Sequence, residues 1–281
     1  MHDLTMSVVI PAHNEEENLQ HTIPDVQSAL QGASIPYEII VVNDNSTDGT
    51  ERVIERLMEG DKNVKAVTRT PPSGFGRAVR SGLEFVQGDV VAIYMADQSD
   101  DPQDLIKCYE KIEEGFDCVF GTRFAKTSKV KGYPRRKLVI NRLVNKAIQI
   151  LFWTRHNDLT NAFKVYRTDV VRECGPYKSS HFNITIEMSL GALIRGYSIA
   201  RVPVNWEGRT WGSSNLRMTE MGRRYLSVLL KVFFERILIS DDLVAERLAR
   251  QLYDNSKSPH LEKRILDLER TVEGLKTKDQ S

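Results

Sequence analysis

Short apolar runs alternate with longer amphipathic stretches along the first half of the chain. The runs are rich in Val and Ile and cover residues 7–10, 38–42, 64–67, 90–94 and 118–120. Short β-branched runs separated by helical stretches are typical of βαβ units. We therefore predict an α/β fold, with a mixed, mostly parallel sheet flanked by helices.

Polar residues at the starts of the helical stretches support this pattern. Ser46, Thr47 and Asp48 precede a predicted helix over residues 50–58. Asp100 or Asp101 is predicted to cap the next helix, with Pro102 in its first turn. Short polar side chains before a helix accept its first free N–H groups, and Pro suits its first turn. Helix capping thus gives a sufficient explanation for both aspartates.

The pattern changes after residue 120 to a basic loop followed by two amphipathic helices, predicted near residues 138–153 and 218–239. Both helices carry basic residues among their apolar ones. They can pack on the sheet or on each other. Alternatively, they can lie in a membrane interface, with apolar faces in the acyl chains and basic groups at the headgroups.

The last forty residues have a different pattern. Leu261, Ile265, Leu268, Val272 and Leu275 repeat at alternating intervals of four and three residues, as in a coiled coil. We predict one domain over residues 1–240 and a helical C-terminal tail over 241–281. The tail is expected to form a homo-oligomer.

Charge is distributed unevenly along the chain. The net charge is only +1, which gives no reason to expect nucleic-acid binding. Residues 118–157, however, include no acidic residue and many basic ones. A basic block of this kind usually contacts phosphates, whether of a lipid surface, a substrate or a nucleic acid.

The chain contains no predicted membrane span. Its start turns polar after a few apolar residues, unlike a signal peptide. The most apolar late segment, residues 226–239, is interrupted by Lys231, Glu235 and Arg236 and is too short to cross a bilayer. The three widely spaced cysteines are expected to be reduced. We predict a cytoplasmic protein, peripheral on the cytosolic face of a membrane.

Polar groups follow several of the predicted strands. Asp97 ends the apolar run of residues 90–94, and polar clusters follow the first and second strands at residues 13–15 and 43–50. Ligands of open α/β sheets bind at the carboxyl ends of the strands. Asp97 is therefore the first candidate for a functional residue.

Taken in order, these segments resemble the inverting GT-A glycosyltransferases of family 2. Within that family the chain is most similar to the dolichol-phosphate mannosyltransferase and bacterial polyprenyl-phosphate glycosyltransferase group. The resemblance covers roughly residues 7–216. It rests on SVVIPAHNEEENL, IIVVNDNSTDGT, SGFGRAVRSGL, YMADQSDDP, FGTRF, DLTNAFKVYR and GRTWGSSNLR.

The resemblance implies a Rossmann-like nucleotide-diphospho-sugar transferase fold and a site for the donor. Asp97 would bind Mg²⁺ or Mn²⁺ bridging the diphosphate, and this cation would stabilise the leaving group. The implied donor-binding residues are Pro11, His13, Asn14, Glu15, Asp44, Gly74, Gly76, Arg77, Ala96 and Asp97.

The resemblance also implies an acceptor side. Arg123, Arg135 and Arg136 match the region that binds the acceptor phosphate, where a guanidinium fork suits phosphate oxygens. Asp158 matches an acid near the sugar, so that Asp97, Asp158 and Arg123 form the implied catalytic set. A lipid phosphate is ionised near neutral pH and needs little help from a general base, so we assign no proton transfer to His13.

The chain departs from the family pattern at several positions. The Asp-Ala-Asp sequence is Met95-Ala96-Asp97 here, and a thioether offers a hard cation almost nothing. Asp-Asp-Gly-Ser becomes Asn43-Asp44-Asn45-Ser46, and Thr-Ser-Gly-Phe becomes Thr160-Asn161-Ala162-Phe163. Asp100 and Asp101 could compensate for the carboxylate lost at Met95, but helix capping explains them more simply.

The resemblance implies transfer of a sugar from GDP-mannose or a UDP-hexose to a polyprenyl or dolichyl phosphate at the cytosolic membrane surface. One alternative is a family 2 glycosyltransferase with a soluble saccharide or other non-lipid acceptor. Another is a non-catalytic nucleotide-sugar-binding scaffold, which Met95 and Asn43 favour. A Rossmann dehydrogenase is disfavoured, because no Gly-x-Gly-x-x-Gly follows the first strand.

Overall fold

The computed structural model describes residues 3–208 and 218–256. The chain divides into two compact units, Met1–Phe234 and Glu235–Ser281. In the second unit the structure describes the end of one helix and the helix α9 (Ser240–Ser256). The predicted coiled-coil positions 261–275 and most of the GRTWGSSNLR segment lie outside the described residues.

A mixed, mostly parallel sheet forms the centre of the first unit, as predicted. Within the described residues it has seven strands in the order β3-β2-β1-β4-β7-β5-β8. Only β7 runs antiparallel to its neighbours among these strands. The strands are β1 (Met6–Ala12), β2 (Tyr37–Asn43), β3 (Val64–Thr68), β4 (Val90–Ile93), β5 (Cys118–Thr122), β7 (Lys164–Arg167) and β8 (Ile199–Pro203). The short strands β6 (Val130–Lys131) and β9 (Trp206–Glu207) pair separately.

The strand register brings the predicted site segments to one edge of the sheet. Ala12 at the end of β1 pairs with Asn43 at the end of β2. Lys164, the first residue of the antiparallel strand β7, lies opposite Ile93 and Phe120. The loop before β7 therefore reaches the same edge as the loops that follow β1, β2, β4 and β5.

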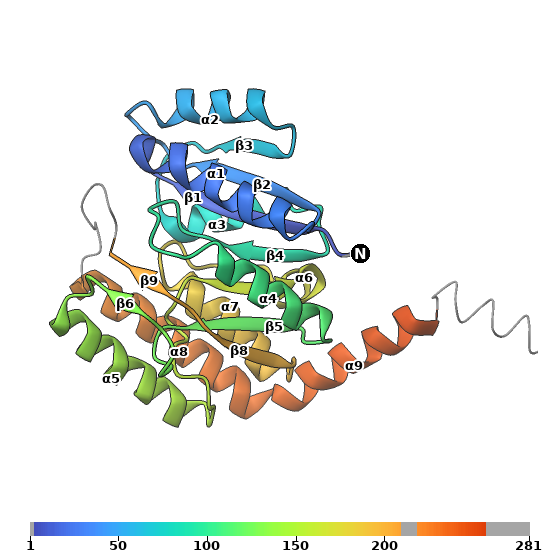
Figure 1. Cartoon of the computed structure of the whole chain (residues 1–281). Coiled ribbons are helices and arrows are strands. Elements are labelled where there is room, and N and C mark those ends of the chain that lie inside the picture. The colour runs from blue at the N-terminus through green and yellow to red at the C-terminus, as the bar shows by residue number, and fades with distance from the viewer. Residues whose placement is uncertain (1–2, 209–217, 257–281) are drawn as a thin grey trace, which may run out of the picture. The chain divides into compact units, whose positions relative to one another are not determined.

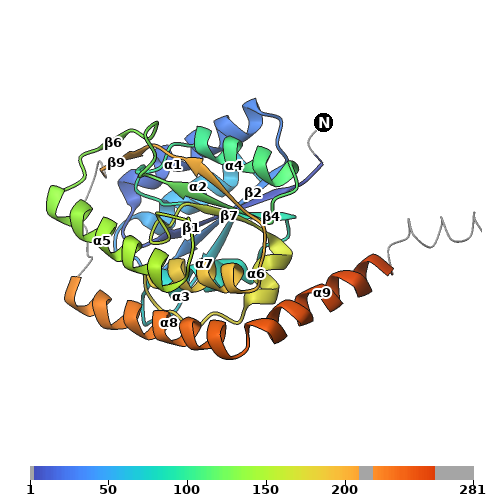
Figure 2. The same ribbon diagram turned by 90° about the horizontal axis from the view of Figure 1, so that it is seen from below.

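Helices cover both faces of this sheet (Figures 1 and 2). The helices α1 and α4 lie on one face, and α3 and α7 lie on the other. Residues such as Val8, Ile10 and Leu19 are fully buried between the sheet and α1. The helices are α1 (Glu16–Gly32), α2 (Thr50–Gly60), α3 (Phe75–Leu83), α4 (Gln103–Glu113), α5 (Arg135–Leu151), α6 (Thr168–Cys174), α7 (Ile184–Ile194) and α8 (Met218–Leu238).

Several boundaries differ from the sequence-based expectations. The helix α5 begins at Arg135, three residues before the predicted start, so Arg135 and Arg136 belong to its first turn and not to a loop. The strands β7 and β8 were not among the predicted strands. Both are short, and each includes charged residues, which obscure an apolar run.

In the part of the chain that the structure describes, no helix combines the length and apolar character that a bilayer crossing requires. The cysteines Cys108, Cys118 and Cys174 are free, as predicted.

Candidate active site

The loops after β1 and β2 are tied together by hydrogen bonds. The ring nitrogen Nδ1 of His13 donates to the main-chain oxygen of Asp44 at 2.7 Å. The side-chain oxygen of Asn14 accepts from the N–H of Thr47 at 2.7 Å, and the N–H of Asn14 donates to Ser46 Oγ at 3.0 Å. Asn14 has a φ of +55°, a backbone conformation that Asn tolerates better than most residues. His13 and Asn14 thus shape this edge of the sheet.

Asp44 connects this edge to the glycine-containing turn before α3. One carboxylate oxygen forms an ion pair with Arg69, and the other accepts from the N–H of Gly74 at 2.6 Å. A Cβ on Gly74 would lie 2.4 Å from the main-chain oxygen of Ser180, and one on Gly76 would lie 2.6 Å from that of Ser179. Only glycine permits this close approach of two backbones.

The segment that faces these glycines is held by Glu187 on α7. Its carboxylate accepts from the N–H groups of Lys178 and Ser179, the latter at 2.8 Å, and lies 3.6 Å from Lys231 Nζ. Glu187 therefore fixes the backbone beside the turn.

The remaining predicted donor-binding residues lie around the same edge. Pro11 is within β1, and Glu15 lies directly before α1, where its carboxylate accepts from Asn18 Nδ2 at 2.5 Å. Arg77 on α3 donates to the main-chain oxygen of Ser73 at 3.0 Å. The main-chain oxygen of Ala96 accepts from Thr22 at 2.7 Å. The structure gathers these residues at one edge, and their roles toward a donor stay predictions.

Asp97 lies just beyond the end of β4 and is 8% exposed. Its Oδ1 accepts from the N–H of Ser99 at 3.2 Å, which closes a short turn. This turn leads into Asp100, which is 7% exposed.

Asp100 does not cap α4, so that explanation from the sequence is wrong for this residue. Asp101 takes the role instead, because its Oδ1 accepts from the N–H of Gln103 at 3.0 Å. Asp100 Oδ2 is buried without a hydrogen-bond partner. Burial raises the pKa of Asp100 to about 7, and the negative charge of Asp97 contributes to the rise. Sequence reasoning weighed Asp100 as a replacement for the lost carboxylate but preferred capping, because a short acid before Pro102 matches the pattern of a helix cap.

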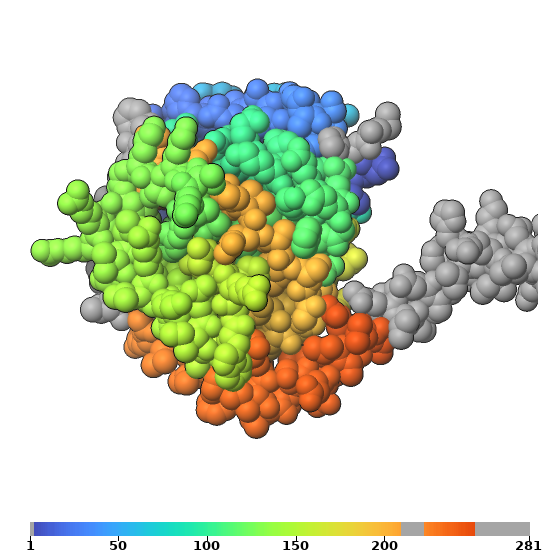
Figure 3. Space-filling model, turned by 60° about the horizontal axis from the view of Figure 1, so that its bottom comes forward, coloured from blue at the N-terminus to red at the C-terminus, as the bar shows by residue number. Residues whose placement is uncertain are grey.

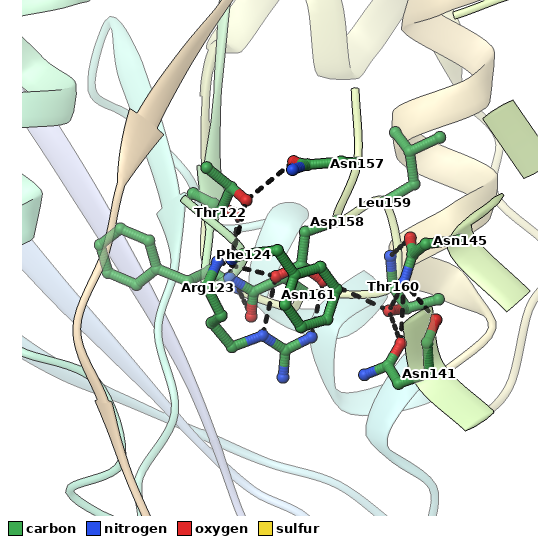
Figure 4. A network of polar contacts seen from close by, with 12 residues as sticks. Thr122, Arg123, Phe124, Asn141, Asn145, Asn157, Asp158, Leu159, Thr160 and Asn161 are labelled. Atoms are coloured by element: carbon green, nitrogen blue, oxygen red, sulfur yellow. Dashed lines mark hydrogen bonds and ion pairs between the residues drawn. The ribbon is translucent and has the colours of Figure 1, made fainter. Parts of the chain in front are cut away.

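Arg123 and Asp158 form a buried ion pair between the loops after β5 and before β7 (Figure 4). The guanidinium donates from Nε at 2.8 Å and from Nη2 at 2.7 Å, one bond to each carboxylate oxygen. The main-chain N–H of Arg123 adds a third bond at 2.9 Å. The rings of Phe124 and Tyr133 lie 5.6 and 5.7 Å from the guanidinium carbon. Two of the predicted catalytic residues are thus partners, and Nη1 takes no part in these bonds.

The loop with Asp158 is connected directly to α5 (Figure 4). Thr160 Oγ1 donates to Asn141 Oδ1 at 2.6 Å and accepts from Asn145 Nδ2 at 2.8 Å. Asn145 is 1% exposed. The inner face of α5 is therefore fixed to the loop that positions Asp158.

Lys164 is a second buried charged group that sequence reasoning did not single out. Its Nζ donates to the main-chain oxygens of Leu159 and Asn161 and lies 5.5 Å from the Phe120 ring centroid. Burial lowers the pKa of Lys164 to about 7. Lys164 thus fastens the loop of Asp158 from within the sheet.

Arg135 and Arg136 lie at the start of α5 and are exposed. The first turn of α5 has no acidic residue and no side-chain cap. A helix N-terminus favours anions, and two cations there lower the stability of the helix unless an anion binds. The first turn of α5 is therefore chemically suited to a phosphate.

The carboxylates at the end of β4 suit a hard divalent cation, since carboxylate oxygens are among the ligands that Mg²⁺ and Mn²⁺ prefer. Among the described residues, no cluster of three or more acidic, His or Cys side chains is arranged to hold a metal unaided. A cation here would need further oxygen ligands, such as those of a diphosphate.

The sheet order, the reversed strand β7 and the acids at one sheet edge define a nucleotide-sugar transferase fold of the GT-A type. Residues 7–175 match the model of glycosyl transferase family 2. The chain belongs to this family and is a glycosyltransferase.

Two curated relatives share much of the chain. The polyprenol monophosphomannose synthase of Mycolicibacterium smegmatis is 28% identical over 74% of this chain and 80% of the relative. The dolichol-phosphate mannosyltransferase of Pyrococcus furiosus is 33% identical over 76% of this chain, but the match spans only 60% of that longer protein.

Among solved structures, the chain is similar to glucosyl-3-phosphoglycerate synthase from Mycobacterium tuberculosis, crystallised with Mn²⁺, uridine diphosphate and phosphoglyceric acid. The TM-score is 0.63 at 21% identity, over 82% of this chain and 79% of that one. This similarity confirms the fold.

Proposed function

We propose that this glycosyltransferase moves a sugar from a nucleotide-diphosphate sugar to a polyprenyl phosphate at a membrane surface. Both curated relatives are named for mannose transfer to a polyprenol or dolichol carrier, which supports the acceptor class and mannose as the first sugar to try. The solved neighbour with bound uridine diphosphate supports a nucleotide-diphosphate donor.

The residues after β1 and β2 are suited to the nucleoside. His13 and Asn14 are hydrogen-bonded to the backbone of the second loop, which holds them in place before a donor binds. The turn at Gly74 and Gly76 is packed directly against the backbone of Ser179 and Ser180, which holds it in place beside these two loops.

Asp97 lies where the donor diphosphate would end. A bound Mg²⁺ or Mn²⁺ would supply charge neutralisation to the leaving nucleoside diphosphate. The residue's own part is to offer an oxygen at the end of β4, oriented by its bond to the N–H of Ser99.

Arg123 is suited to orient the acceptor phosphate. Asp158 holds its guanidinium plane with bonds to Nε and Nη2, and Nη1 remains for a phosphate oxygen. Because the acceptor oxygen is already ionised, positioning and charge neutralisation supply the acceleration, and no base is required. Arg135 and Arg136 at the α5 N-terminus extend this positive region.

The proposal of a lipid acceptor rests mainly on the outer face of α5. Val139, Leu143 and Ile150 on α5, and Trp153 just after it, are 57, 64, 65 and 72% exposed, although they are large and apolar. Arg142, Lys146 and Arg155 are exposed among them. Figure 3 shows α5 in light green at the surface, with long side chains extending from it. Apolar groups flanked by basic ones are suited to an anionic membrane.

The first unit's part of α8 continues this face. Phe152 at the end of α5 and Phe233 on α8 are in edge-to-face contact, with ring centroids 6.4 Å apart. On α8, Leu226, Leu230 and Phe234 are 55, 47 and 54% exposed, whereas Val228 and Val232 are buried. Since Asn141 and Asn145 join α5 to the loop of Asp158, a docked membrane would present its lipid phosphate beside the site.

The test is a transfer assay with radiolabelled GDP-mannose or UDP-glucose, Mn²⁺ and a short polyprenyl phosphate, with 3-phosphoglycerate as the alternative acceptor. We expect label in the organic phase. The Asp97→Ala variant should lose at least about 100-fold of this activity, since a metal contributes several kcal/mol to the transition state.

Transfer to 3-phosphoglycerate alone would contradict the lipid acceptor and leave a soluble-acceptor enzyme. Full activity of Asp97→Ala would contradict the role of Asp97. Calorimetry with each nucleotide, with and without Mn²⁺, names the donor independently of the acceptor.

A further inference from the structure

The acidic residues that follow β4 include one buried carboxylate with an oxygen that no hydrogen bond of the described fold satisfies. Asp100 is 7% exposed, and its Oδ2 has no hydrogen-bond partner within the described structure. Its carboxyl group does receive the main-chain N–H of Met95, so one side of the group is fixed. Buried polar atoms are nearly always satisfied, and an exception calls for a ligand or a function.

The backbone holds Asp100 firmly in this position. Tyr94 Oη donates to the main-chain oxygen of Asp100 at 2.6 Å, and Tyr94 is 1% exposed. Asp100 also forms an isolated β-bridge with Trp206, and the N–H of Glu207 donates to Ser99 at 3.0 Å. These contacts join the end of β4 to a segment about a hundred residues later and determine the burial of Asp100.

The carboxyl group of Asp100 lies within the influence of charges of both signs. Among charged groups, Asp97 has the largest electrostatic effect on Asp100, and Arg123 has the next largest. Two carboxylates buried close together repel each other, and a cation between them converts the repulsion into attraction. Asp101 already caps α4, so capping gives no explanation for Asp100.

We infer that Asp100 is the second protein carboxylate of the divalent-cation site at Asp97, and that it replaces the carboxylate that Met95 cannot supply. This inference rests on the proposed donor site, because the diphosphate oxygens complete the coordination. One or two carboxylates plus substrate phosphates are the usual protein contribution to a magnesium or manganese site. Here the two carboxylates come from the turn after β4, three positions apart.

The test is a titration of Mn²⁺ into protein with GDP or UDP, in which electron paramagnetic resonance measures the free Mn²⁺. We compare wild type with Asp97→Asn, Asp100→Asn and Asp101→Asn. We expect Asp97→Asn and Asp100→Asn each to weaken Mn²⁺ binding at least tenfold. Asp101→Asn is the matched control, because an amide oxygen still accepts from Gln103, and its Mn²⁺ affinity should equal that of wild type.

Thermal melting without metal distinguishes a role of Asp100 in metal binding from a role in the stability of the fold. Asp100→Asn removes a buried charge that repels Asp97, so it should melt at the wild-type temperature or above. Added Mn²⁺ and nucleotide should raise the melting temperature of wild type and not that of Asp100→Asn.

The inference would be overturned if Asp100→Asn binds Mn²⁺ within twofold of wild type while Asp97→Asn loses Mn²⁺ affinity. The metal site at Asp97 would then remain, without Asp100. A lower melting temperature of metal-free Asp100→Asn would also overturn it, since Asp100 would then be structural. No Mn²⁺ binding by wild type with either nucleotide would overturn the metal site as a whole. Transfer to a soluble acceptor would contradict the proposed lipid acceptor and leave Asp100 as a ligand, because Mn²⁺ binding does not depend on the acceptor.

Discussion

Arg123 and Asp158 are each less than 10% exposed and depend on each other for neutrality. We expect Asp158→Asn to lower the free energy of unfolding by about 3–5 kcal/mol, because it leaves a buried guanidinium without its counter-ion. Urea denaturation followed by circular dichroism measures the loss.

The matched comparison is the double variant Arg123→Met, Asp158→Leu, which removes both charges. Its free energy of unfolding should lie closer to that of wild type than that of Asp158→Asn, because no charge remains buried without a partner. An Asp158→Asn variant as stable as wild type would mean that another acid, such as Asp100, neutralises Arg123.

Lys164 makes the free energy of unfolding depend on pH. Burial lowers its pKa from 10.5 to about 7. Between these values the unfolded chain binds a proton that the folded chain does not, so the free energy of unfolding rises with pH in this window. The rise for one proton is at most about 1.4 kcal/mol per pH unit.

Urea denaturation at several pH values from 6.5 to 9.5 tests this dependence. Lys164→Met cannot titrate, so its free energy of unfolding should change less with pH than that of wild type above pH 7. Parallel profiles of the two proteins would contradict the lowered pKa.

Local sequence patterns single out candidate residues that their neighbours along the chain define, but not those whose setting depends on distant segments. Asp97 ends an apolar run, and Asp158 heads a recognisable segment. Asp100 looks like a helix cap, and its burial depends on contacts with a distant segment of the chain, such as the bridge with Trp206. Lys164 sits in a short strand whose burial depends on β4 and β5. Such long-range packing cannot be read from local patterns.

At the scale of elements, α5 has two faces with different tasks. Its inner face is bonded to Thr160, and its outer face carries the exposed apolar residues. We expect the double variant Leu143→Glu, Ile150→Glu to lose at least about 10-fold of its binding to vesicles of phosphatidylcholine and phosphatidylglycerol, since two apolar contacts become acidic. Vesicle flotation measures the binding.

Phe85→Glu is the control, because Phe85 is 53% exposed but lies outside α5 and α8. It should float with vesicles as wild type does. Nucleotide binding of both variants should be unchanged in calorimetry. Flotation of the α5 variant at the wild-type level would contradict the membrane face.

The predicted elements agree best with the structure where apolar runs are long. The strands β1 and β2, rich in Val and Ile, were predicted within three residues at each end. The start of α5 was missed because its first turn is basic and looks like a loop. Its two faces were both expected, but the sequence could not decide which apolar residues are covered by the fold.

At the scale of the whole molecule, the predicted C-terminal coiled coil lies outside the described residues and stays a prediction. Truncation after Asp254 should reduce the mass measured by light scattering to that of a monomer, because the apolar seam of residues 261–275 is removed. An unchanged mass would contradict an oligomer formed by this tail. Transfer activity of the truncated protein would show that the tail is not required for catalysis.

The reversed direction of β7 has a consequence for how this protein family diversifies. The chain leaves the sheet after Thr122 and re-enters it at Lys164, on the neighbouring strand. Residues 123–163 therefore form one continuous insertion. Such an insertion can be exchanged or lengthened without a change in the order or direction of the strands. The proposed donor side is instead assembled from several separate strand ends. If the acceptor binds this insertion as proposed, acceptor preference can change through replacement of a single piece of the gene, while donor chemistry is inherited with the scaffold.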